Sequence, residues 1–244
     1  MGGADHTIAA PRASRVDCAA KRFLDAAGAA LLLVVLAPLM LAVAVAIKLD
    51  SPGPVFYRCR RVGYRGGELA MLKFRKMRDD ASGPALTLVE DERFTRVGRV
   101  LAASKLDELP QLWNVLKGEM SLVGPRPESP EFVELHGDRY ETILSVRPGI
   151  TGLCQLAFAK EGRILDPVNR IEDYKRRLLP QKVAVDHLYA SARSLRMDAS
   201  ILLWTAVAVF VRADVAVNRA TGALTRRRRQ VPAEALAPGA AETS

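Results

Sequence analysis

The stretch that decides the fold is KLDELPQLWNVLKGEMSLVGPRPE, residues 105–128. Its apolar residues recur at helical spacing, at Leu106, Leu109, Leu112, Trp113 and Leu116, and predict a helix that Gly118 ends. Pro110 fits best in the first turn of that helix, so Asp107 and Glu108 come just before its N-terminus. The following MSLVGPRP predicts a short strand that runs into a loop fixed by two prolines.

Two adjacent carboxylates in this position are suited to catalysis. The helix dipole favours negative charge there, so both side chains are expected to be ionised. One acid can attack or bind a metal while the other moves a proton. Acids also occur at helix starts for stability alone, and the two residues by themselves favour that second interpretation.

Basic side chains near this stretch are candidates for binding phosphate. Arg126 lies between two prolines, and a rigidly held guanidinium suits bidentate contact with a phosphate or diphosphate. Lys73, Arg75 and Lys76, in the segment KFRKM, form a second basic group. A solvated charged face is the alternative interpretation of that group.

Upstream, residues 26–47 contain no charged or hydrogen-bonding side chain and predict a membrane segment. A straight helix of this length reaches about 33 Å, enough to span a bilayer core. Pro38, however, removes a helical hydrogen bond and predicts a break at Ala37-Pro38. Basic residues flank both ends, which favours a re-entrant helix on the cytoplasmic face over a spanning helix. Asp25 is expected to pair with Lys21 and Arg22 at the interface.

The remaining sequence predicts a small mixed domain. PVFYRCRRVGY and ELAMLKFRKM, on either side of Gly66-Gly67, predict a hairpin, and residues 130–145 predict a helix. Residues 171–189 and 201–211 suit interfacial helices or, equally, core helices. The run Arg226–Arg229 suits lipid headgroups.

Composition limits the choice of function. The formal net charge of +9 points to an anionic partner, namely nucleic acid, an acidic membrane or a phosphorylated substrate. No nucleic-acid recognition motif accompanies the charge, so nucleic-acid binding is not expected. The three cysteines are too far apart for a disulfide framework or a zinc ribbon.

Taken together, the membrane segment, KFRKM, DERFTRVGR, KLDELPQLWNVLKGEMSLVGPRPE and RPGITGLCQ resemble the bacterial sugar transferases, the monotopic polyprenyl-phosphate phosphoglycosyl transferases. The resemblance covers roughly residues 21–198. It departs from the family at Ala37, where many members carry Ser. It departs again at Ala102, where many carry Arg, a role that can move to Lys105 or Arg99.

The resemblance implies an enzyme that uses Mg²⁺ to move a phospho-sugar from a UDP-sugar to undecaprenyl phosphate or another polyprenyl phosphate. Asp107 would attack the phosphate next to the sugar, forming a covalent aspartyl intermediate and releasing UMP. Glu108 would act as base or hold the metal with Asp107, and Arg126, Lys73 and Arg75 would bind phosphate. This step would begin exopolysaccharide, capsule or O-antigen assembly.

The predicted fold is a helix-rich α/β (α+β) catalytic domain on a re-entrant N-terminal helix, in the minimal form of the family. Its parts are expected at residues 1–20 (disordered tail), 21–50 (membrane helix), 51–200 (catalytic domain), 201–225 (interfacial helices) and 226–244 (basic, then disordered tail). The expected location is the inner membrane, with the catalytic domain in the cytoplasm, and a homo-oligomer is left open. The rival hypothesis is a non-catalytic scaffold, anchored in the bilayer, that binds anionic lipid or partner proteins.

Overall fold

The computed structural model describes residues 15–79, 81, 91–159, 165–166, 169–211 and 213–226. Its first element is the long helix α1 (Arg15–Asp50), the one helix in the described ranges that is long and apolar enough to cross a membrane. The helix begins before residue 21, so residues 15–20 are helical, where a disordered tail was expected. The other residues of the two expected tails, apart from Arg226, lie outside the described ranges.

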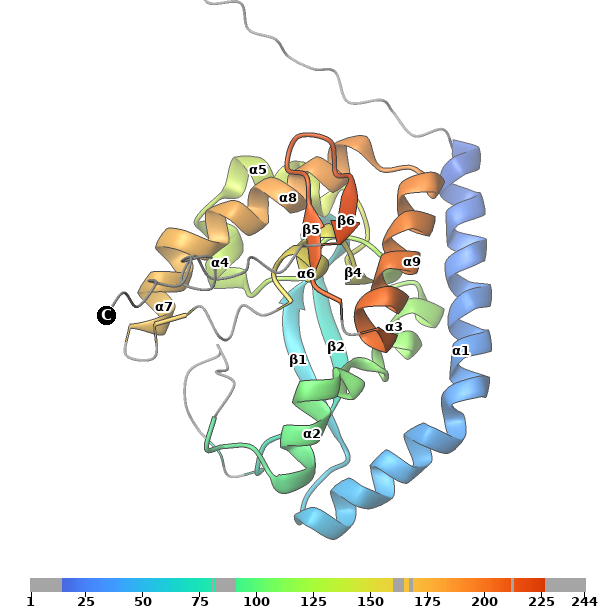
Figure 1. Ribbon diagram of the computed structural model, residues 1–244, viewed down its shortest axis with the longest axis vertical. Helices are drawn as coiled ribbons and strands as arrows, with labels where there is room; N and C mark the ends of the chain where they lie inside the picture. Colours follow the sequence, from blue (N-terminus) through green and yellow to red (C-terminus); the bar gives the residue numbers. More distant parts are fainter. Residues whose placement is uncertain are drawn as a thin grey trace, which may run out of the picture.

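Helix α1 is continuous but bent (Figure 1). Pro38 lies near its middle, where the missing amide proton and the bulk of the ring give the bend a physical cause. Its first half packs through Ala29, and its second half packs through Val43 and Ile47. The bend therefore lets both halves of α1 contact the rest of the chain. Helix α1 lies along one edge of the molecule (Figure 1).

Within the described ranges, the strands form three separate two-stranded sheets. The antiparallel pair β1 (Phe56–Val62) and β2 (Glu68–Phe74) confirms the expected hairpin, with a 3₁₀ turn η1 (Tyr64–Gly66) between the strands. A parallel pair, β3 (Ser121–Val123) and β4 (Gly149–Thr151), lies in the middle of the fold. The third pair is antiparallel and consists of β5 (Val215–Val217) and β6 (Leu224–Arg226).

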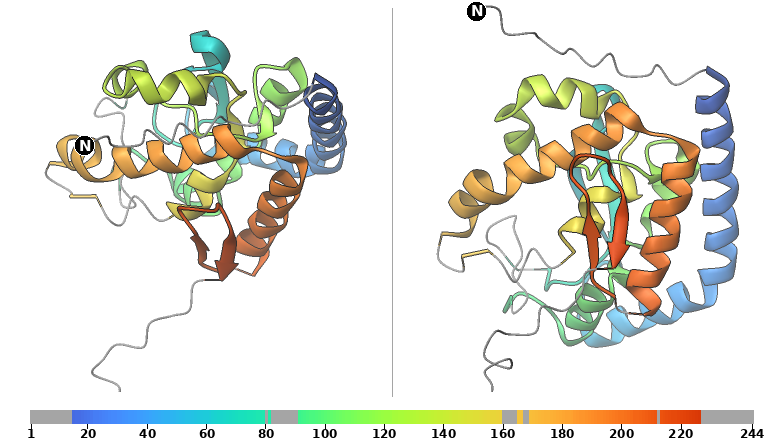
Figure 2. Two further views of the ribbon diagram at one scale, coloured as in Figure 1. Left: turned by 90° about the horizontal axis from the view of Figure 1, so that it is seen from above. Right: turned by 45° about the horizontal axis from the view of Figure 1, so that its top comes forward.

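Helices surround these strands and confirm a mixed, helix-rich fold (Figures 1 and 2). Before β3 come α2 (Arg96–Ser104), the 3₁₀ turn η2 (Leu106–Glu108) and α3 (Gln111–Lys117). Between β3 and β4 come α4 (Pro130–Glu134) and α5 (Gly137–Leu144). After β4 come α6 (Leu153–Ala157), α7 (Arg170–Asp173), the π-helical segment η4 (Tyr174–Leu178), α8 (Leu179–Ala192) and α9 (Leu195–Phe210).

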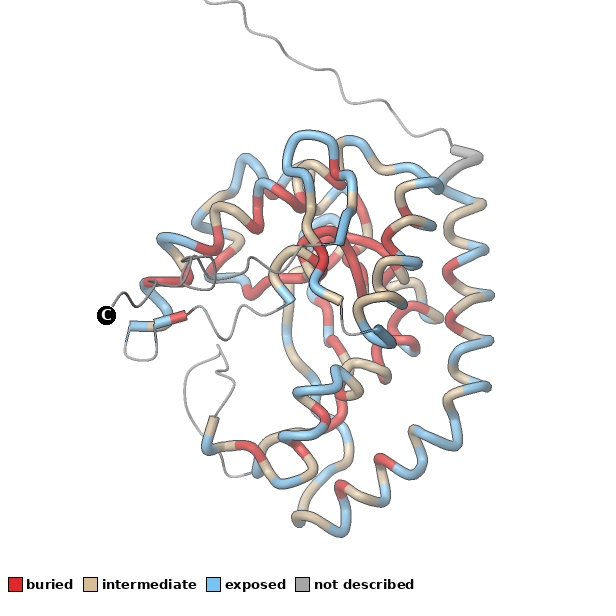
Figure 3. Tube along the Cα trace, viewed as in Figure 1, coloured by how far each residue is buried: buried red, intermediate tan, exposed pale blue. Residues whose placement is uncertain are grey.

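The C-terminal part follows the core-helix alternative for residues 171–189 and departs in part from the interfacial helices expected at residues 201–225. Helix α8 carries the fully buried Val183 and Val185, so it is a core helix (Figure 3). Helix α9 ends at Phe210, and a hairpin follows it where further helix was expected. Ile201 and Val215 belong to the same apolar cluster as Leu153, so the core continues past residue 200. Long-range packing determines which of these C-terminal elements are buried, and sequence periodicity does not report such packing.

Candidate active site

The acidic pair lies on a tight turn between two helices. Helix α2 ends at Lys105, whose backbone is left-handed (φ 61°, ψ 13°) and therefore turns the chain sharply. Asp107 and Glu108 follow in η2, and α3 begins after Pro110 and ends at Gly118 (φ 87°), as the sequence predicts. The turn places both carboxylates just before the N-terminus of α3.

Asp107 is buried, with only 1% of its surface exposed. Its Oδ2 atom lies 2.9 Å from the ammonium nitrogen of Lys76. Its Oδ1 atom has no hydrogen-bond partner among the described residues. A buried carboxylate oxygen is normally hydrogen-bonded, so this bare oxygen leaves an acceptor position open on Asp107.

Glu108 lies between two cations. Its Oε1 atom is 2.9 Å from the Lys73 ammonium nitrogen and 3.5 Å from Nη2 of Arg126. Burial alone would raise the pKa of Glu108, but Lys73 and Arg126 outweigh it and hold that pKa far below its ordinary value. Glu108 therefore stays ionised and is a poor proton acceptor.

Arg75 does not join this group. Its guanidinium donates hydrogen bonds to the backbone carbonyls of Ser51 and Pro52, and only 5% of the residue is exposed. Strand β2 ends at Phe74, so the two-residue alternation that would align Arg75 with Lys73 stops there. Lys76 takes the place expected of Arg75, and Arg75 fixes the turn after α1.

Lys105 is the further cation of the site. Its charge interacts with the charges of Glu108, Arg126 and Asp107. Lys105 is one of the two residues, with Arg99, to which the sequence allowed the role of the family arginine at Ala102 to move. A turn with left-handed backbone, which brings the side chain back toward the carboxylates, is visible only in three dimensions.

The loop that carries Arg126 is held by close backbone packing and by a buried ionic cluster. A Cβ on Gly124 would come within 2.4 Å of the Arg147 carbonyl oxygen, so only glycine fits there. Asp186 accepts a hydrogen bond from the backbone amide of Arg126, and burial raises the pKa of Asp186 to about 8. Glu128 lies two residues beyond Arg126, and its Oε1 atom is 3.1 Å from the Lys182 nitrogen.

Asp107 and Glu108 are the side chains that could hold a metal ion. No group of three or more His, Cys, Asp and Glu that could hold one occurs in the described ranges. Mg²⁺ at phosphate-transfer sites usually takes one or two carboxylates and completes its shell with water and substrate phosphates. An ionised Glu108 next to Asp107 fits that kind of shared site.

Comparison with known proteins agrees with this geometry. The family model described as "Bacterial sugar transferase" matches residues 16–212. The chain belongs to this family. The match includes α1, the acidic turn and the Arg126 loop, so the family assignment covers nearly all of the described structure.

Curated relatives carry more specific names. The chain is 42% identical over 190 residues to a UDP-glucose:undecaprenyl-phosphate glucose-1-phosphate transferase of Caulobacter vibrioides, covering 76% of this chain and 67% of the relative. It is 38% identical over 207 residues to the exopolysaccharide production protein PSS of Rhizobium leguminosarum, covering 81% and 98%. A Xanthomonas campestris transferase with the same name as the Caulobacter protein is 41% identical over 202 residues, covering 78% of this chain but only 38% of the relative.

Proposed function

We propose that this sugar transferase moves a phospho-sugar from a UDP-sugar to undecaprenyl phosphate and releases UMP. The observation that carries the proposal is the bare, buried Oδ1 atom of Asp107, whose other carboxylate oxygen is paired with Lys76. Relatives named as UDP-sugar and undecaprenyl-phosphate transferases support the two substrates. Names of further relatives support a place in exopolysaccharide production.

The reaction has two steps. In the first, Asp107 Oδ1 forms a bond to the phosphorus next to the sugar, the bond from that phosphorus to the bridging oxygen breaks, and UMP leaves with that oxygen. In the second, an oxygen of the polyprenyl phosphate attacks the same phosphorus, and the Asp107 carboxylate is released. Lys76 holds Oδ2 throughout, which keeps Oδ1 directed at the substrate.

Glu108 supports this chemistry by charge and position. Its depressed pKa disfavours a role as base, and an attacking phosphate, already an anion at neutral pH, needs none. Arg126 and Lys105 carry the positive charge that a diphosphate substrate requires. Mg²⁺ bound to Asp107, Glu108 and substrate phosphates would supply further neutralisation of phosphate charge.

Contacts at both ends of α1 support a re-entrant topology. Near its start, Arg22 and Asp25 bind α3 and β3. Near its end, Ile47 packs in the cluster that contains Phe74, and Asp50 accepts a hydrogen bond from the amide of Val97. A helix whose two ends contact one polar domain has both ends on one side of a bilayer.

The proposal accordingly includes a location at the inner membrane, with the catalytic domain on the cytoplasmic face where UDP-sugars are dissolved. A thiol probe at an Ala10→Cys substitution should resist a membrane-impermeant reagent in intact cells. Labelling there from the periplasm would show that the N-terminus crosses the bilayer, and it would refute the re-entrant topology.

The decisive experiment measures UMP release by the protein in nanodiscs with Mg²⁺, undecaprenyl phosphate and a panel of UDP-sugars. We expect release with one sugar, a covalent adduct seen by intact mass without the acceptor, and loss of both in Asp107→Asn. Asp91→Asn is the matched control, because Asp91 is also an ion-paired acid with a largely covered side chain (7% exposed) but contacts Arg93 outside the site. Equal activity in the wild type and Asp107→Asn would refute the proposal.

A further inference from the structure

One turn near the start of α1 contacts both halves of the active site. Arg22 donates hydrogen bonds to the carbonyl oxygens of Val115 (2.7 Å) and Leu116 (2.8 Å), in the last turn of α3. The Val115 carbonyl also accepts the amide of Gly118, and Arg22 adds a side-chain cap to this end of α3. The opposite end of α3 follows directly after Asp107 and Glu108.

Three residues later in the same turn, Asp25 binds β3. Its Oδ2 atom accepts a hydrogen bond from the Ser121 hydroxyl (2.8 Å), and its Oδ1 atom accepts one from the Leu122 amide (3.1 Å). Only 6% of Asp25 is exposed, so it is not the interfacial side chain that the sequence predicts. A Cβ on Gly28 would lie 2.9 Å from the Leu122 side chain, which shows how closely α1 and β3 approach.

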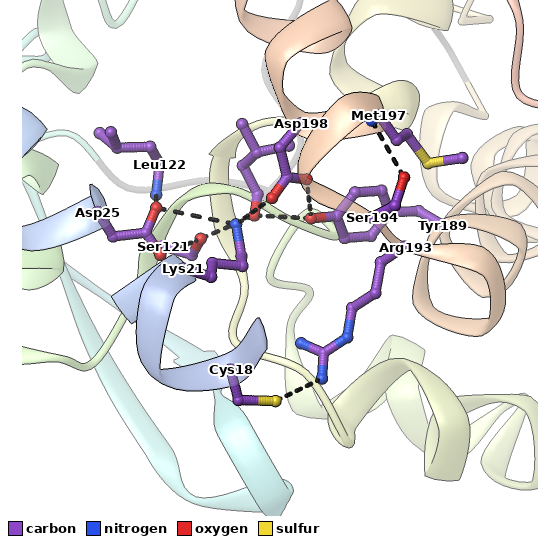
Figure 4. A network of polar contacts seen from close by, with 11 residues as sticks. Cys18, Lys21, Asp25, Ser121, Leu122, Tyr189, Arg193, Ser194, Met197 and Asp198 are labelled. Carbon is purple, nitrogen blue, oxygen red and sulfur yellow. Dashed lines mark hydrogen bonds and ion pairs between the residues drawn. The ribbon is translucent and has the colours of Figure 1, made fainter. Parts of the chain in front are cut away.

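A buried polar network extends these contacts to α8 and α9 (Figure 4). The Lys21 nitrogen lies 2.6 Å from Oδ2 of Asp198 and 3.8 Å from Oδ1 of Asp25. The Tyr189 hydroxyl lies 2.6 Å from Oδ1 of Asp198 and 3.1 Å from the carbonyl oxygen of Val123. Val123 is the last residue of β3, and Arg126 follows three residues later.

Burying this network costs free energy unless every polar member is hydrogen-bonded or ion-paired. The network therefore favours one position of α1 relative to β3, α8 and α9. Through Arg22 it holds the helix that follows Asp107 and Glu108. Through Asp25 it holds the strand that leads to Arg126. The same turn of α1 thus holds both the helix that follows the proposed nucleophile and the strand that leads to the phosphate-binding arginine.

We propose that Asp25 is a positioning residue for the transfer reaction, which fixes β3 on α1 and thereby sets the place of Arg126 opposite Asp107 and Glu108. The inference rests on the proposed function and deepens it, because it couples the seating of the membrane helix to the geometry of the site. Asp25 acts through Arg126 and touches no substrate.

A double-mutant cycle tests this coupling. Because an error of about 1 Å in the site can cost about 100-fold in rate, Asp25→Asn is expected to lower kcat/KM for the UDP-sugar by about 10- to 100-fold. In an Arg126→Ala background the same substitution should cost less than about 2-fold, since the group it positions is gone. Phe23→Ala, an exposed residue in the same turn (73%), should leave kcat/KM unchanged.

Equal losses in the two backgrounds would overturn the proposal, because a general weakening of the fold is additive with loss of Arg126. An activity-independent readout is hydrogen exchange on the full chain in nanodiscs. Asp25→Asn should increase exchange in residues 121–127 and leave residues 137–144 unchanged. No change in residues 121–127, or a uniform increase, would also overturn it. Absence of UMP release by the wild type would instead refute the proposed function, and the exchange data would still decide whether Asp25 fixes β3.

Discussion

The buried cluster beside the Arg126 loop predicts a large loss of stability in Lys182→Met. Lys182 is only 3% exposed, and its nitrogen lies 3.1 Å from Glu128 Oε1 and 2.7 Å from the Tyr174 hydroxyl. Burial alone would raise the pKa of Glu128, but Lys182 and Tyr174 hold it below its ordinary value. Methionine fills a similar volume without charge, so the substitution leaves a buried carboxylate without its cation.

Removing one member of a buried ion pair typically costs about 3–5 kcal/mol. At about 2.1 cal/mol/K per residue, unfolding of a 244-residue chain has an entropy of about 0.5 kcal/mol/K, so Tm should fall by about 6–10 °C. Thermal unfolding in detergent, followed by near-UV circular dichroism, measures this shift. Lys117→Met is the matched control, since the Lys117–Glu119 pair is exposed and should change Tm by less than about 2 °C.

The double variant Lys182→Met/Glu128→Gln distinguishes a charge effect from a packing effect. The introduced glutamine would keep a hydrogen bond with Tyr174 but would carry no charge. Most of the lost stability should therefore return, to within about 2 °C of the wild-type Tm, because neutral partners avoid the cost of an isolated buried charge. A double variant as unstable as Lys182→Met, or a single variant with a shift below about 2 °C, would refute the ionic reasoning.

Three further outcomes are expected. Burial raises the pKa of Asp186 from 3.8 to about 8, so the wild type should lose stability as pH rises from about 4 to 8, by up to about 1.4 kcal/mol per pH unit. The free energy of unfolding, measured with urea between pH 5 and 8, should fall less steeply with pH in Asp186→Asn than in the wild type. Equal pH dependence in the two proteins would contradict this. Arg75→Met should lower Tm without changing the KM for the UDP-sugar, whereas Lys73→Met should lower kcat/KM about 10-fold or more. A higher KM in Arg75→Met would place Arg75 in the site. Gly98→Ala puts a Cβ 1.8 Å from the Lys76 carbonyl oxygen and should displace Lys76. The rate of adduct formation, followed by intact mass, should therefore fall about 100-fold. A normal rate would show that the backbone adapts without moving Lys76.

Much of the site's local structure was predictable from sequence. The acidic turn, the start of α3 after Pro110 and its end at Gly118 depend on residues within a few positions of one another. The same holds for the β1–β2 hairpin around Gly66-Gly67. Short-range rules for helix ends and turns apply wherever such residues occur, so these predictions are confirmed.

Assignment of particular cations was less successful. Sequence grouped Lys73, Arg75 and Lys76, and could not tell which of them face the acids. The end of β2 at Phe74 decides this, because it rotates Lys76 toward Asp107 and leaves Arg75 to bind the carbonyls after α1. A strand's last residue depends on its pairing with a neighbouring strand, which a local pattern does not report.

By itself, the sequence determined the apolar helix, its bend at Pro38, the acidic turn and the family. Each follows from local composition, from the covalent constraint of a proline or from a run of motifs in order. Only the tertiary structure decided that Asp25 is buried against β3, that Lys21 meets Asp198 and that α9 packs in the main core. The contacts of Asp25 with β3 and of Lys21 with Asp198 join residues about 100 or more positions apart, and the energies of all these contacts arise when burial removes water from both partners at once.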